Sequence, residues 1–438
     1  SGILFKRDNK KHLDQIKKQN FKNIDLVIVN FYPFEKTIFE TKNENKIIEK
    51  IDIGGPALVR SAAKNFKDVV VITSNYQLNN LINEMNNYRG STSLKFRKEL
   101  SREAFNQTAY YDMNISNYFN KIMNNRYPNK ITFGGTLINK LRYGENPHQS
   151  GALYSKDNFN ELEKLNGKEL SYNNYNDIYF GLDIINSLPR GIGTAIIKHA
   201  NPSGVSIDKN QLSSFKKAYC CDPISAFGGV IICNYKIKYE TAKEISGKFF
   251  EVVVAKDFDR RALSILKKKK NLRIIKNNQK IYPNQMVVNI LSNNFILQNS
   301  DNENFNKKLF KTVSKKKPSK KMFSDLIFAF NICRFVKSNA IVLTNNNSTV
   351  GIGSGQPSRL DSCKIAVNKM KKFNHNTENL VAASDAFFPF VDGIESLVQS
   401  GVKAIIQPYG SIRDREIIKF ANNTNTVLVF SKTRHFRH

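Results

Sequence analysis

The chain lacks any apolar run long enough to cross a membrane, since a spanning helix needs about 20 consecutive apolar residues. The N-terminal segment shows no charged and then apolar pattern of a secretory signal, so secretion is not predicted. Cysteine is scarce, and the five cysteines form no C-x-x-C pair and no zinc-ligand spacing. We therefore expect reduced thiols, no zinc and a cytoplasmic protein without a membrane anchor.

Acidic residues are also scarce, with 37 Asp and Glu against 68 Lys and Arg, for a net charge of +31. Such a charge is compatible with a nucleic-acid-binding protein. However, the basic residues are spread along the chain, and no nucleic-acid motif accompanies the denser runs at 267–270 and 315–321. An enzyme surface that attracts anionic metabolites is the favoured interpretation. A nucleic-acid-binding module stays the alternative, and it predicts binding that weakens steeply with salt.

Strand-like and helix-like patterns alternate along most of the chain. In the N-terminal part, apolar runs at 24–34 and 69–74 flank a glycine turn and a helical pattern at 54–65, an order typical of a βαβ unit. Residues 77–125 show mostly helical spacing. In the C-terminal part, a glycine loop at 351–355 precedes three strands separated by short helices. The pattern predicts an α/β protein with an open sheet.

Two polar stretches predict boundaries within the chain. The segment RYPNK, residues 126–130, separates an N-terminal domain at 1–125 from a domain at 131–438. The run SKKKPSKK is typical of an exposed connection. It divides the second domain into subdomains at about 131–313 and 322–438.

The segment AIIKHANPSG, residues 195–204, is the most informative part of the sequence. An apolar strand-like run ends in Lys198 and His199, and a turn follows. In open α/β sheets, ligands bind at the carboxyl ends of strands. A lysine beside a histidine supplies positive charge and a group that titrates near neutral pH, which suits a transfer reaction on an anionic substrate. A solvated strand end is the alternative for this segment alone.

Ten short motifs occur in one order along nearly the whole chain: VNFYPF, IDIGG, AAKN, LRYGENPHQ, KHANPSG, SAFGG, KSNAIV, GIGSGQPSR, SDAFFPF and TRHFRH. Together they resemble the bifunctional purine-biosynthesis family that joins phosphoribosylaminoimidazolecarboxamide (AICAR) formyltransferase and inosine monophosphate (IMP) cyclohydrolase. The resemblance implies a truncated Rossmann-like (methylglyoxal-synthase-like) N-terminal domain. Two cytidine-deaminase-like α/β/α units would follow it.

The resemblance also implies two reactions. The C-terminal half would transfer a formyl group from 10-formyltetrahydrofolate to the amine of AICAR, and the N-terminal half would close formyl-AICAR to IMP with loss of water. The family implies a homodimer that binds AICAR and folate, with no nucleic acid or membrane as partner. The zinc-deaminase pattern of H-x-E with P-C-x-x-C is absent, so no zinc-bound water is expected.

Formyl transfer needs a base for the weakly nucleophilic amine, stabilisation of an oxyanion and a proton for the leaving nitrogen. His199 is the natural base, and Lys198 supplies positive charge near the oxyanion or the leaving group. The resemblance adds Asn339, whose side chain would orient the formyl group by hydrogen bonding. It also implies a set of substrate-binding residues: Arg142, Tyr143, Gln356, Phe387, Asp392 and Arg434.

Two further sites follow from the resemblance. Asp385 and Ser338 resemble members of a potassium site, although Ala340 stands where the family has a second serine. The ring-closing site of the family matches three residues of the N-terminal domain: Tyr32, Asp52 and Lys64.

The N-terminal domain begins at Ser1 without the phosphate-binding turn and lysine that open it in the family, so we expect little cyclohydrolase activity from the chain as given. An inactive scaffold protein is the other alternative. The intact set of Lys198, His199 and Asn339 argues against it.

Overall fold

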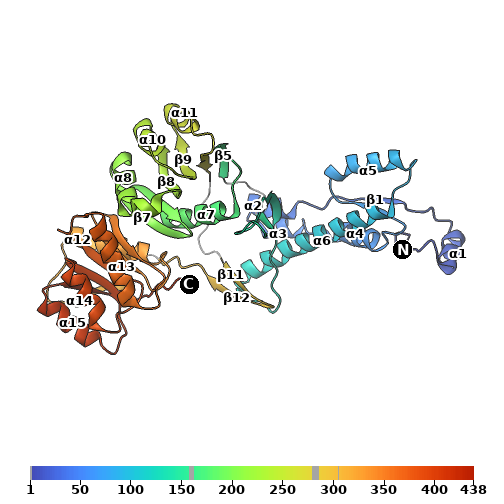
Figure 1. Ribbon diagram of the computed structural model, residues 1–438. Coiled ribbons are helices and arrows are strands. Elements are labelled where there is room, and N and C mark those ends of the chain that lie inside the picture. Colours follow the sequence, from blue (N-terminus) through green and yellow to red (C-terminus); the bar gives the residue numbers. More distant parts are fainter. Residues whose placement is uncertain (1, 157–161, 279–285, 304) are drawn as a thin grey trace. The chain divides into compact units, whose positions relative to one another are not determined.

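The computed structural model describes residues 2–156, 162–278, 286–303 and 305–438 (Figure 1). The chain divides into two compact units, with the main division between Thr136 and Leu137 and a short segment at 154–156 belonging to the smaller, N-terminal unit. The boundary predicted at 126–130 lies shortly before this division. None of the helices in the described ranges is long and apolar enough to cross a membrane.

The smaller unit is built on two parallel strands that flank a helix, as the βαβ pattern predicted. Its core packs Val59 and Ala62 of that helix against Val71 and Ile72 of the second strand. The elements are β1 (Leu26–Ile28), β2 (Val70–Ile72), α1 (Lys10–Lys18), α2 (Phe34–Glu40), α3 (Glu44–Ile48), α4 (Gly54–Lys64), α5 (Tyr76–Asn87) and α6 (Leu94–Ile122).

The first half of the larger unit is a six-stranded part of a mixed sheet. Its order is β5, β10, β9, β8, β6, β7, in which β8, β9 and β10 are parallel and the other pairings are antiparallel. The strands are β5 (Leu162–Asn166), β6 (Ile192–Lys198), β7 (Asn201–Asp208), β8 (Val230–Ile237), β9 (Val252–Phe258) and β10 (Arg273–Asn277). The helices are α7 (Tyr172–Ser187), α8 (Gln211–Cys221), α9 (Pro223–Ala226), α10 (Tyr239–Ser246) and α11 (Arg260–Lys267).

The second half repeats this topology. Its order is β13, β18, β17, β16, β14, β15, again with three parallel strands in the middle and antiparallel pairings around them. The strands are β13 (Phe310–Thr312), β14 (Ile341–Asn345), β15 (Ser348–Gly353), β16 (Val381–Ser384), β17 (Ala404–Pro408) and β18 (Val427–Ser431). The helices are α12 (Lys320–Cys333), α13 (Arg359–Lys372), α14 (Val391–Gln399) and α15 (Asp414–Asn423).

The two halves form one twelve-stranded sheet because β7 pairs with β15 at Ser206 and Ser348. Helices α7 and α12 share one apolar core on one face of this sheet. The helices α8, α10 and α11 cover the other face of the first half, and α13, α14 and α15 cover that face of the second half. The predicted α/β class is therefore confirmed: the larger unit has three layers, a mixed sheet with helices on both faces. The finer fold names of the two domains stay predictions.

Three smaller elements remain. Strands β3 (Thr136–Leu141) and β4 (Gly151–Ser155) form one two-stranded sheet, and β11 (Met286–Leu291) and β12 (Asn294–Asn299) form an antiparallel hairpin. A short 3₁₀ helix, η1 (Lys307–Leu309), precedes β13.

At one position of a central strand, the covering helix lies so close to the backbone that only glycine fits. A Cβ on Gly204 of β7 would lie 1.9 Å from the carbonyl oxygen of Ala218 in α8. We expect Gly204→Ala to lower the free energy of unfolding by about 1–3 kcal/mol, because backbone must move to admit the methyl group. Gly247→Ala is the control, since its Cβ would meet an ordinary contact at 3.5 Å. Equal urea-unfolding midpoints for the two variants would contradict this packing.

Candidate active site

The lysine and histidine singled out in the sequence stand at the end of a central hairpin. Lys198 is the last residue of β6, and the two-residue turn His199-Ala200 leads into β7 at Asn201. Both turn residues have positive φ, 55° and 49°. A type I′ turn, which matches the twist of a hairpin, requires positive φ at both of its central residues. The His199 side chain is exposed. The Nζ of Lys198 donates a hydrogen bond to the carbonyl of Phe227 at 2.7 Å.

Asn201 connects this turn to the second half of the sheet. Its Oδ1 accepts hydrogen bonds from the backbone amide of Lys337 at 3.4 Å and from the hydroxyl of Ser354 at 3.1 Å. The motifs KHANPSG, KSNAIV and GIGSGQPSR, far apart in the sequence, therefore meet at one place. Within the described residues, no hydrogen bond joins the side chains of Lys198 or His199 directly to Asn339.

The side chain of Asn339 is held in one orientation by three hydrogen bonds. Its Nδ2 donates to the carbonyls of Gln356 at 2.8 Å and Pro357 at 2.9 Å, and its Oδ1 accepts from Arg359 at 2.7 Å. Both amide protons are thus in use, and the acceptor capacity left over belongs to Oδ1.

Arg359 is a site residue that the sequence analysis missed. Its side chain is 8% exposed and donates to Asn339, to the hydroxyl of Ser384 at 2.7 Å and to the carboxylate of Asp385. Asp385 is fully buried and also accepts from the Ser338 hydroxyl. Arg359 is the last residue of the motif GIGSGQPSR, in which only Gln356 was predicted to bind substrate.

The predicted potassium ligands are engaged with protein groups. One carboxylate oxygen of Asp385 accepts from Arg359 and the other from Ser338, so a guanidinium already balances the charge. Among the described residues, no group of three His, Cys, Asp or Glu side chains could hold a metal. These two side chains alone do not fit a cation, and potassium stays a prediction that would need main-chain oxygens.

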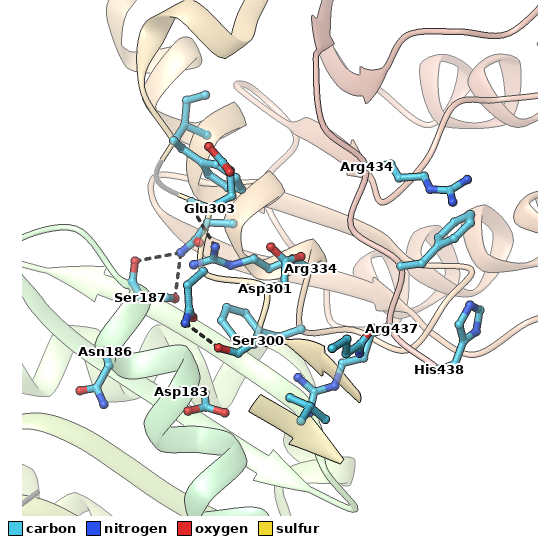
Figure 2. A pocket seen from close by; sticks show the side chains of 18 of the residues that line it. Asp183, Asn186, Ser187, Ser300, Asp301, Glu303, Arg334, Arg434, Arg437 and His438 are labelled. Atoms are coloured by element: carbon cyan, nitrogen blue, oxygen red, sulfur yellow. Dashed lines mark hydrogen bonds between the residues drawn. The ribbon is translucent and has the colours of Figure 1, made fainter. Parts of the chain in front are cut away.

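A cavity of about 1490 Å³ is lined in part by Arg437 (Figure 2). It adjoins the Asn339 segment, because the carbonyl of Arg437 accepts a hydrogen bond from the backbone amide of Ser338 at 2.9 Å. Residues of α7, the β11–β12 hairpin, α12 and the C-terminal segment line it. Arg434, predicted to bind substrate, is among them. Arg334 and Arg437 add two partly buried guanidinium groups, and burial lowers the pKa of both. The lining also carries the carboxyl groups of Asp183, Asp301 and Glu303, whose charges act on Arg334, so the cavity is mixed in charge.

The C-terminal segment is anchored beneath this cavity by a buried histidine. The Nδ1 of His435 lies 2.6 Å from a carboxylate oxygen of Asp301, and its Nε2 lies 3.0 Å from the Thr433 hydroxyl. Burial is the largest single effect on Asp301 and would raise its pKa, but the hydrogen bond and charge of His435, the charge of Arg334 and the backbone amide of Glu303 together lower it.

The remaining predicted ligands are distributed over three places. Phe387 lies with Asp385 in the loop after β16, whereas Asp392 is the second residue of α14, where its carboxylate accepts from the amide of Gly393 at 2.7 Å. Arg142 and Tyr143 follow β3, with the guanidinium 5.7 Å from the ring centre. No described hydrogen bond ties this pair to the turn at His199.

In the smaller unit, two of the three predicted cyclohydrolase residues meet. The carboxylate of Asp52 accepts from the backbone amides of Tyr32 at 3.4 Å and Gly55 at 2.7 Å, at the start of α4. Lys64 lies exposed at the far end of that helix. Among the described residues, no hydrogen bond joins the Lys64 side chain to Tyr32 or Asp52.

Fold and site together define an α/β protein with a duplicated sheet, in which Lys198 and His199 stand at the turn where the two halves meet. Comparison with known proteins gives the particular family. The profile of the AICARFT/IMPCHase bienzyme family matches residues 62–369, and the chain belongs to this family. Its role is that of AICAR formyltransferase and IMP cyclohydrolase in de novo purine biosynthesis.

Curated relatives are similar over the whole chain. The bifunctional purine biosynthesis protein PurH of Bradyrhizobium diazoefficiens is 41% identical, covering 100% of this chain and 85% of the relative. PurH of Leptospira biflexa is 42% identical, covering 100% and 86%. Among solved structures, a crystal structure of ForH matches 27% of this chain and 62% of its own at 26% identity, with a TM-score of 0.24, too low to inform the fold.

The buried pair of Arg359 and Asp385 generates a stability prediction. Asp385→Ala leaves the Arg359 charge buried without its partner, so we expect a loss of about 3–5 kcal/mol in the free energy of unfolding. The control is Asp361→Ala, which removes an exposed carboxylate 4.0 Å from Lys364 and is expected to cost less than about 1 kcal/mol. Urea titrations that give the same loss for both variants would contradict the buried pair.

Proposed function

We propose that formyl transfer takes place at the carboxyl end of β6, with His199 as the base for the AICAR amine and Lys198 as the nearby cation. The observation that carries this proposal is the pair of hydrogen bonds from Lys337 and Ser354 to Asn201. They gather three separate motifs around one hairpin turn. A base and a positive charge beside a set of fixed polar groups are what acyl-type transfer to a weak nucleophile requires.

In the proposed reaction, the amine nitrogen of AICAR attacks the formyl carbon of 10-formyltetrahydrofolate while His199 accepts the amine proton. The carbonyl oxygen becomes an oxyanion in the tetrahedral intermediate. The bond from the formyl carbon to the folate nitrogen then breaks, and that nitrogen takes up a proton as tetrahydrofolate leaves. Lys198 donates one of its three ammonium protons to the carbonyl oxygen of Phe227. Its other two protons are available to the oxyanion or the leaving group.

Asn339 has a narrower role than the sequence suggested. Because both protons of its amide are donated to Gln356 and Pro357, it would meet the substrate through Oδ1 as an acceptor. We propose that it accepts a hydrogen bond from the attacking amine and so orients that amine rather than the formyl group. Arg359 would hold Asn339 in this orientation.

The nucleotide would be bound by the predicted set around the junction. Arg142 and Arg434 suit the phosphate because a guanidinium pairs with phosphate oxygens in a bidentate way. Phe387 belongs to the loop of Asp385, Asp392 lies in the first turn of α14 after that loop, and the carbonyl of Gln356 holds Asn339. We propose that these three residues border the site. Tyr143 would accompany Arg142.

In the smaller unit, Tyr32, Asp52 and Lys64 are proposed for ring closure of formyl-AICAR, with Asp52 at the start of α4 as the central group. A homodimer, a potassium requirement and a cytoplasmic location are further proposals that rest on the family. The five free cysteines favour a reducing compartment. No step above depends on potassium.

The role of His199 is tested by formyl transfer from 10-formyltetrahydrofolate to AICAR, followed as tetrahydrofolate release. We expect His199→Ala to lower kcat by roughly 10²–10⁴-fold, the usual contribution of a general base. Asn346→Ala is the matched control, because Asn346 is the first residue of the corresponding turn in the second half, with φ 53°. It should leave kcat within about twofold. An active His199→Ala variant would exclude this residue as the base.

The product of the same assay tests the N-terminal unit. If Asp52 is needed for ring closure, Asp52→Ala makes formyl-AICAR accumulate in place of IMP, when the two are separated chromatographically. Adding synthetic formyl-AICAR provides the control, because it bypasses formyl transfer. IMP formation at the rate of formyl transfer would contradict this expectation.

A further inference from the structure

The internal repeat places an aspartate in the same position of both halves. Asp177 is the sixth residue of α7, and Asp325 is the sixth residue of α12. Each helix precedes the hairpin of its own half, β6–β7 or β14–β15. No motif of the sequence analysis included either aspartate.

Each aspartate binds the backbone of the turn that ends its hairpin. The carboxylate of Asp177 accepts from the amide of Ala200 at 2.7 Å. The carboxylate of Asp325 accepts from the amides of Asn346 at 3.1 Å and Asn347 at 2.6 Å. Both carboxyls are largely buried, and burial raises the pKa of each while the turn amides oppose that rise.

These turns need an anchor because their residues adopt a costly conformation. All four turn residues, His199, Ala200, Asn346 and Asn347, have positive φ near 50° and none is glycine. A non-glycine residue in this region is strained and persists where its surroundings hold it. Asparagine tolerates the left-handed region better than alanine or histidine. The turn of the first half therefore depends more on its aspartate than the turn of the second half does.

The two turns differ in the chemistry that they carry. The second-half turn presents two asparagines, whereas the first-half turn presents His199 directly after Lys198. Burial is the largest effect on the Asp177 carboxyl and raises its pKa, whereas a positive charge on His199 lowers the pKa of the same carboxyl. Glu251 is the other charged group that affects this carboxyl.

We infer that Asp177 is a positioning residue for formyl transfer: by binding the Ala200 amide it fixes the turn from which His199 projects toward the substrate. The inference rests on the proposed role of His199. A displacement of about 1 Å in a reacting group can cost roughly a hundredfold in rate, so loosening this turn lowers kcat even though Asp177 does not touch the substrate. The repeat supplies an internal control, because Asp325 performs the same anchoring where no reacting group is attached.

The test compares Asp177→Ala with Asp325→Ala in the full chain, measuring kcat and the KM for AICAR alongside the thermal unfolding midpoint. We expect Asp177→Ala to lower kcat by roughly ten- to a hundredfold with KM changed less than threefold. Asp325→Ala should keep kcat within about twofold although its unfolding midpoint also falls. Asp177→Asn, which keeps an acceptor for the Ala200 amide, should give an intermediate kcat.

Two results would overturn the inference: an unchanged kcat in Asp177→Ala, or equal losses of kcat in Asp177→Ala and Asp325→Ala, which would mean general destabilisation. If either alanine variant fails to fold, the isosteric pair Asp177→Asn and Asp325→Asn decides by the same comparison. His199→Ala separates this inference from the proposed function. Activity in that variant removes the role of His199 itself, whereas an inactive His199→Ala with a normal Asp177→Ala removes only the role of Asp177.

Discussion

The pairing of β7 with β15 is the contact on which the candidate site depends. Val205 exchanges hydrogen bonds with the Thr349 hydroxyl at 2.9 and 3.2 Å, and the amide of Ile207 donates to the carbonyl of Asn347 at 2.9 Å. These bonds lie in the buried middle of the sheet, where an unpaired backbone group would be costly. They make one sheet of two similar halves, and so bring the turn of the first half beside the segments of the second half that carry Asn339 and Arg359.

The polar groups around Asn339 are ordered by a buried charge pair. Arg359 is almost entirely buried, and a guanidinium in that environment needs both a counter-charge and acceptors for its protons. Asp385, Ser384 and Asn339 supply them. Because the arginine uses its donors in fixed directions, it also fixes which atom of the Asn339 amide faces outward. The acceptor role that we propose for Asn339 follows from this network.

The two halves of the sheet share their structural features but differ in the residues at their turns. In both halves a helix supplies an aspartate to a two-residue turn, and a glycine in the central strand, Gly204 or Gly351, allows a covering helix to lie against the backbone. These features keep the sheet together in each half. Only the first half carries Lys198 and His199 at its turn, so the chemical difference between the halves resides in a few residues on a common frame.

The sequence by itself determined the α/β class, the βαβ unit around α4 and the family resemblance, because these depend on local periodicity and on short contiguous motifs. The same motifs led to the prediction that Lys198 and His199 act in formyl transfer. It also indicated the motif that contains Arg359 without identifying the arginine. Only the tertiary structure revealed the duplication, the anchoring of two turns by Asp177 and Asp325, and the use of both Asn339 amide protons by carbonyls. Their physical reason is the same: each depends on hydrogen bonds between residues distant in sequence, and no local pattern reports which distant donor will meet which acceptor once the sheet has formed.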